Sequence, residues 1–307
     1  MTKKFTFILL AIVLCTSLCS ATPLRREHVP AGAQWVFHAD FDAFRSSEIG
    51  TLIQQNIIRD HKEKIDALTQ LLGTDLTQDI YGVTLYGSEP GDKNASALFY
   101  GTFAKDKLLT LLRLNKAYAE SDYNGRTLYY WVDDKRKKDQ VGAFAADGLI
   151  VIGQKESCVI TALDVLSGRI EPLSQHKDAP LYSLCNVSSS TFVLAAAVGV
   201  SDLVRDDQHA AILKNSHVLA IAGFEDSGLV NLTINLETET EAAAEQVEQV
   251  VRGMMAFASL SQQEHPQIAP LLQAGTLSRE GSKLAYRFEY PSGKLFDVLK
   301  SFRNKKM

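Results

Sequence analysis

His38, Asp40 and Asp42 are the residues in this 307-residue chain whose types and spacing come closest to a chemical site. They alternate along and just after the strand-like run Gln34–Phe41, so the two-residue period of a strand would place all three on one face. Imidazole and carboxylate groups are common ligands of divalent metals, and the pattern therefore suggests a metal site. The structural alternative is the polar face of a strand that runs into a turn, where Asp42 or Ser46 caps the next helix.

Two aromatic residues form a second candidate site. Tyr129 and Trp131 share one face of a predicted strand, where they could stack on a bound ligand such as a sugar or a peptide. The alternative is that both rings pack in the hydrophobic core.

The chain lacks the short motifs that usually mark an enzyme. It contains no Gly-x-Ser-x-Gly, no His-Glu-x-x-His, no phosphate-binding glycine loop and no Cys-x-x-Cys. We therefore predict no catalytic residue and no cofactor.

The first 21 residues have the features of a cleavable secretory signal peptide. Lys3 and Lys4 precede the apolar run Phe5–Cys15, and small residues lead up to Ala21, so cleavage would leave Thr22 as the first residue. The apolar run is too short to cross a bilayer as a helix, so no stable transmembrane anchor is expected after cleavage. The mature protein is predicted to be exported, to the periplasm or the extracellular medium.

Cleavage changes the charge and the cysteine count. Loss of two lysines moves the formal net charge from −4 to −6, which disfavours nucleic acid as a partner. Cys15 and Cys19 leave with the signal peptide, so Cys158 and Cys185 remain. Export permits a disulfide between them, and two buried thiols are the alternative.

The order of predicted elements repeats along the chain. Each half reads β-α-β-β-α-β-β-α, with an extra strand in the first half. Short hairpin loops make neighbouring strands antiparallel, and helices with one apolar stripe suit one face of a sheet. The predicted fold is therefore α+β, with two similar domains that each pack helices on one face of a mostly antiparallel sheet. The predicted boundaries are 1–21 for the signal peptide, 22–170 for the first domain, 171–180 for a linker and 181–307 for the second domain.

Three stretches of the first half carry a resemblance. They are Trp35–Ser47, the phrase Gly73–Gly87 with its Val-Thr-Leu-Tyr-Gly strand, and the strand and helix of Gly148–Gly168. Over residues 35–168 the chain resembles a group of uncharacterised exported bacterial α+β proteins. The resemblance implies a fold and an exported location, and it brings no catalytic residue with it.

These observations favour a non-enzymatic exported protein that binds a protein or envelope partner through open sheet faces or the groove between the halves. One alternative is a metal-dependent or hydrolase-like enzyme with a site near His38, Asp40 and Asp42. Another is a carrier of a lipid or other small ligand, for which an apolar cavity with a mouth to solvent would be the sign.

Overall fold

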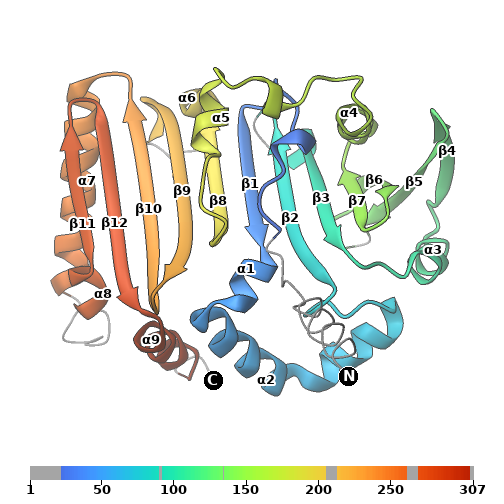
Figure 1. Ribbon diagram of the computed structural model, residues 1–307, viewed down its shortest axis with the longest axis horizontal. Coiled ribbons are helices and arrows are strands. Elements are labelled where there is room, and N and C mark those ends of the chain that lie inside the picture. Colours follow the sequence, from blue (N-terminus) through green and yellow to red (C-terminus); the bar gives the residue numbers. More distant parts are fainter. Residues whose placement is uncertain (1–21, 90–91, 134, 205–212, 261–268, 305–307) are drawn as a thin grey trace, which may run out of the picture.

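A single antiparallel sheet runs through the molecule (Figure 1). The computed structural model describes residues 22–89, 92–133, 135–204, 213–260 and 269–304, so the predicted signal peptide lies outside the described residues. Within these ranges, twelve strands form one sheet in the order β11-β12-β10-β9-β8-β1-β2-β3-β7-β6-β5-β4. The α+β class with a large antiparallel sheet is thereby confirmed.

The elements follow the chain in this way. The strands are β1 Trp35–Asp40, β2 Ile80–Gly87, β3 Ala95–Gly101, β4 Ala119–Tyr123, β5 Arg126–Asp133, β6 Lys138–Ala146, β7 Leu149–Gly153, β8 Thr191–Val198, β9 Ser216–Asp226, β10 Leu229–Thr238, β11 Gly275–Glu280 and β12 Lys283–Pro291. The α-helices are α1 Phe41–Ser46, α2 Glu48–Leu72, α3 Lys105–Leu112, α4 Glu156–Leu166, α5 Pro180–Leu184, α6 Val200–Leu203, α7 Glu241–Leu260, α8 Ala269–Gln273 and α9 Ser292–Asn304. Short 3-10 helices cover Arg26–His28, Asp92–Asn94 and Leu173–Gln175.

The strand order records the internal repeat. From the centre outward, the second half runs β8-β9-β10-β12-β11 and the first half runs β1-β2-β3-β7-β6, so equivalent strands take equivalent places. The two halves join where β1 pairs with β8, with Phe37 opposite Ala195. The sheets of the two predicted domains are therefore one continuous sheet, and β5 and β4 extend it at the first-half edge.

In the first half, helices cover both faces of the sheet, whereas the sequence pattern predicted one. Leu98 and Val151 are fully buried in a core with Leu163 of α4. Their strand neighbours Phe99 and Ile150 point the other way, toward α3. Helices follow on both faces because these strands carry apolar side chains on both.

The long helix α2 connects the two halves. Ser47 caps its start by accepting a hydrogen bond from the Gly50 N–H, and Gly73 ends it in the left-handed region at φ 69°. A kink at His61, with φ −129°, falls within the charged stretch 59–64. In Figure 1, α2 runs along the lower edge of the view, and it contacts α1, α9 and α3.

The predicted linker 171–180 packs against the first half. Leu173 is fully buried, and its N–H donates to the Val29 carbonyl oxygen at 2.7 Å. Pro172 forms an isolated bridge with Pro30. No helix within the described ranges has the length and apolar character to cross a bilayer.

Candidate functional site

An apolar hollow lies between the first-half strands and the helices that face them. Its volume is about 480 Å³, within the 300–1,000 Å³ usual for ligand pockets. Phe99 and Ile150 form its floor, Leu108 and Leu112 of α3 one wall, and Phe41 of α1 lines it as well. The cavity therefore assembles side chains that lie more than a hundred residues apart in the sequence.

The packing of the two sheet faces differs. Leu98 and Val151 are 0% exposed on the α4 side, whereas Phe99, Ile150 and Ile152 are only partly buried on the cavity side. Helix α2 shows the same contrast, since Ile49 is the only apolar side chain that it fully buries among those the structure describes. The cavity side of the sheet is thus packed less tightly than the opposite core.

Tyr129 and Trp131, predicted from the sequence as stacking residues, both line this cavity. Tyr129 meets Phe144 edge to face, with ring centroids 5.9 Å apart. Trp131 lies over Gly142, where a Cβ atom would come within 3.1 Å of the indole ring. Gly142 therefore makes room for the indole in the cavity wall.

Polar groups are few at this site. Thr74 is buried in the wall, and its hydroxyl oxygen accepts a hydrogen bond from the Ala104 N–H at 3.3 Å. Lys105 is exposed beside the cavity, with its Nζ atom 5.1 Å from the centroid of the Phe144 ring. The described lining therefore forms an apolar chamber with a cation near its wall, as is typical of ligand-binding pockets.

The predicted metal residues have other roles. His38 is buried, and its Nε2 atom lies 2.9 Å from the Thr22 carbonyl oxygen while Nδ1 lies 2.9 Å from Thr84 Oγ1. A carbonyl can only accept, so Nε2–H donates, and the Thr84 hydroxyl donates to Nδ1. Burial lowers the pKa of His38 to about 4, so the ring is neutral at neutral pH. Both ring nitrogens are thereby occupied.

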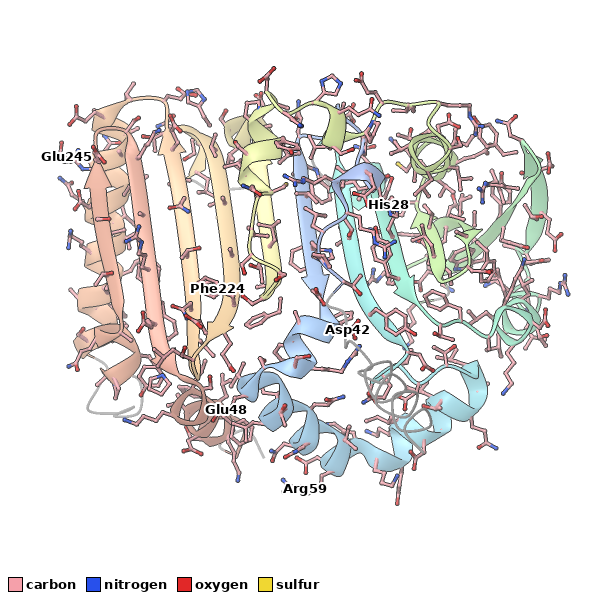
Figure 2. All side chains as sticks on the ribbon, in the orientation of Figure 1. His28, Asp42, Glu48, Arg59, Phe224 and Glu245 are labelled. Atoms are coloured by element: carbon pink, nitrogen blue, oxygen red, sulfur yellow. The ribbon has the colours of Figure 1, made fainter. Side chains whose placement is uncertain are left out.

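The two aspartates separate at the end of β1. Asp40 is fully buried and caps α1, where Oδ1 accepts from the Ala43 N–H at 2.8 Å. Asp42, at the β1–α1 junction in Figure 2, pairs with Arg45 and accepts from the Thr22 hydroxyl at 3.2 Å. The residue that caps α1 is thus Asp40, and not Asp42 or Ser46 as expected from the sequence. Among the residues that the structure describes, no group of three or more His, Cys, Asp or Glu side chains could hold a metal ion.

Cys158 and Cys185, for which the sequence left open a disulfide or two thiols, are free thiols in the structure. Cys185 is buried in the first-half core, and burial raises the pKa of its thiol to about 12. Cys158 lies in the first turn of α4, and its Sγ donates to the Lys93 carbonyl oxygen at 3.8 Å. The alternative of unpaired thiols is the one observed.

Comparisons with known proteins add little on function. No protein-family model matches the chain, and no curated protein matches it. Among solved structures, crystal form III of TP0453 is similar with 12% identity and a TM-score of 0.48, over 90% of this chain and 97% of that chain. Crystal form IV of TP0453 gives 14% identity and a TM-score of 0.45, over 91% and 97%. Function must therefore be argued from the chain itself.

Proposed function

We propose that this chain is a non-enzymatic binding protein that holds an apolar ligand, such as an acyl chain, in the cavity between the first-half strands and α3. The observation that carries the proposal is a hollow of about 480 Å³ lined by aromatic and aliphatic side chains. Close packing is the rule in protein interiors, so an apolar hollow of this size is an exception that a ligand would explain. Lys105 supports an amphiphile, because its ammonium group lies where an anionic head could pair with it.

Binding of dansyl-undecanoic acid, a fluorescent fatty acid, tests the proposal. We expect its emission to rise on binding and to fall when oleate displaces it. Ile150→Trp would fill the cavity floor and should weaken binding at least tenfold. Met254→Trp adds comparable bulk on the exposed face of α7 and should leave binding unchanged. Absence of saturable binding, or equal binding by both variants, would refute the acyl-chain ligand.

A protein partner is the second candidate, and the observation that favours it is on α7. Val250, Met254 and Phe257 are 50%, 65% and 73% exposed and recur at helical spacing. Contiguous exposed apolar side chains are typical of interaction surfaces. A photo-crosslinking residue at position 257 should then capture one defined protein in the envelope fraction, while the same residue at exposed Leu114 should not.

We also propose that the protein acts after export and loss of residues 1–21. The pattern of a cleavable signal peptide in residues 1–21 supports this. Sequencing of the N-terminus of the native protein from the envelope and the medium tests both the cleavage position and the location.

A further inference from the structure

The chain around Thr22 enters the fold at a buried polar cluster. Thr22 is only 8% exposed, although it directly follows the predicted cleavage position. Its carbonyl oxygen accepts from His38 Nε2, and its hydroxyl donates to Asp42 Oδ2. Backbone and side chain of Thr22 are therefore both held in place.

Asp40 is incompletely satisfied in the same cluster. It is 0% exposed, its Oδ1 atom caps α1, and its Oδ2 atom has no hydrogen-bond partner among the described residues. Burial raises the pKa of Asp40, and the N–H groups of Ala43 and Thr22 partly offset that effect. The Thr22 nitrogen thus faces this carboxylate without completing a hydrogen bond to Oδ2. A buried carboxylate oxygen without a partner is costly, and such atoms call for an explanation.

The charges of the cluster are also unbalanced. Asp40 and Asp42 contribute two negative charges when ionised, Arg45 contributes one positive charge, and His38 is neutral. One further cation beside Asp40 would neutralise the cluster.

We propose that this cluster is the receptor for the α-ammonium group that cleavage creates at Thr22. A leader peptidase would hydrolyse the Ala21–Thr22 peptide bond with one water molecule, which leaves a carboxylate on Ala21 and an ammonium group on Thr22. That group would stand at the position of the present Thr22 N–H, facing Asp40, and would donate to Oδ2. Processing would thereby complete a buried ion pair that the precursor lacks. The inference rests on the proposed cleavage and is independent of the cavity ligand.

A double-variant cycle tests this receptor. Chains that begin at Thr22 and at Ala21 are each made with Asp40 and with Asp40→Asn, since asparagine also caps helices but carries no charge. We expect the chain that begins at Thr22 to melt at a higher temperature than the one that begins at Ala21, because the extra residue displaces the ammonium group. The gap should vanish with Asp40→Asn, whereas a purely steric effect of Ala21 would persist. Asp147→Asn, in an exposed hairpin turn, should leave the gap intact.

Chemical labelling gives a readout that does not depend on the Asn variant folding. The α-amine of Thr22 should be acetylated at least about tenfold more slowly than that of the chain beginning at Ala21, as expected when an ion pair raises an amine pKa by one unit or more. Equal labelling rates, equal melting temperatures, or a native N-terminus other than Thr22 would overturn the proposal.

Discussion

The carboxylate of Glu225 accepts a hydrogen bond from the backbone N–H of Ile49 at 2.9 Å, although 176 residues separate the two. The same carboxylate accepts from the Glu48 N–H at 2.7 Å and from the Ser292 hydroxyl at 2.7 Å. Glu225 lies near the end of β9, Glu48 begins α2 near the lower edge of Figure 2, and Ser292 begins α9. One side chain of the second half therefore anchors the helix that leads to the cavity.

Glu225→Gln should loosen the start of α2. The amide cannot supply the negative charge that suits a helix N-terminus, so we expect a loss of about 1–2 kcal/mol in the free energy of unfolding at pH 7. Hydrogen exchange at the amides of Glu48 and Ile49 should accelerate. Glu280→Gln, an exposed change in the same half, should alter neither quantity.

The effect of Glu225 should also depend on pH. Burial raises the pKa of this carboxyl, but its three hydrogen bonds outweigh burial and lower the pKa below 4.5 overall. A lowered carboxyl pKa stabilises the fold above the unfolded value, and the contribution is lost as pH falls through the folded value. The difference between wild type and Glu225→Gln should therefore shrink below about pH 4.5. A difference that stays constant down to pH 3 would contradict the hydrogen-bonded carboxylate.

His38 makes stability fall on mild acidification. Burial holds its pKa near 4, against 6.5 for the ordinary group, so between these values the unfolded chain binds a proton that the native chain does not. The free energy of unfolding should fall by up to about 1.4 kcal/mol per pH unit as pH drops from 6.5 to 4. Denaturant melts at pH 7, 6 and 5 would measure this.

Two variants isolate that contribution. His38→Gln keeps an amide donor for the Thr22 carbonyl but does not titrate, so its stability should vary less over this range. His217→Gln replaces an exposed histidine and should keep the wild-type slope. Equal slopes for wild type and His38→Gln would show that the buried ring is not the source.

Free thiols should be visible chemically in the chain that begins at Thr22. Its intact mass should not change on reduction, since Cys158 and Cys185 are unpaired. Cys158 is partly exposed and should react slowly with a thiol reagent in the native state. Cys185 should react only after unfolding, because it is buried and its thiol pKa is about 12. Labelling of Cys158→Ser and Cys185→Ser separates the two, and a mass gain on reduction would restore the disulfide.

Much of the fold follows from local pattern. The strand and helix expected over 148–168 are β7 and α4, and Gly73 ends α2 as a helix C-terminal glycine should. The edge strand β4 escapes this logic, because its sequence Ala-Glu-Ser-Asp-Tyr has no apolar alternation and its side chains are mostly exposed. This strand forms because it pairs with β5, and its own sequence does not predict that pairing.

The cavity could not be predicted as a site. Leu98 and Phe99 are both apolar strand residues, and the sequence gives no sign that one meets α4 while the other faces a hollow. The sequence does predict that Tyr129 and Trp131 share one face of a strand, and both line the cavity. It does not predict the cavity itself. The alternating pattern of His38, Asp40 and Asp42 showed that these side chains are polar and share a strand face. It did not show their hydrogen-bond and ion-pair partners, which are Thr22, Thr84 and Arg45.

A single methyl group added at Gly142 should disturb the cavity wall. The backbone there is ordinary strand, so the cost of Gly142→Ala comes from contact, with the added Cβ about 3.1 Å from the Trp131 ring and 3.2 Å from the Val151 carbonyl oxygen. The carbonyl belongs to the neighbouring strand and can yield little, so the indole must move toward the hollow. We expect a loss of roughly 1–3 kcal/mol in the free energy of unfolding and a changed Trp131 emission, measured in a Trp35→Phe background.

Gly253→Ala is the control, because it adds the same methyl group to exposed α7 with nothing within 4 Å. It should stabilise the protein by up to about 1 kcal/mol. If both substitutions stabilise the protein and leave the emission unchanged, Trp131 does not pack on Gly142 and the cavity wall is built differently.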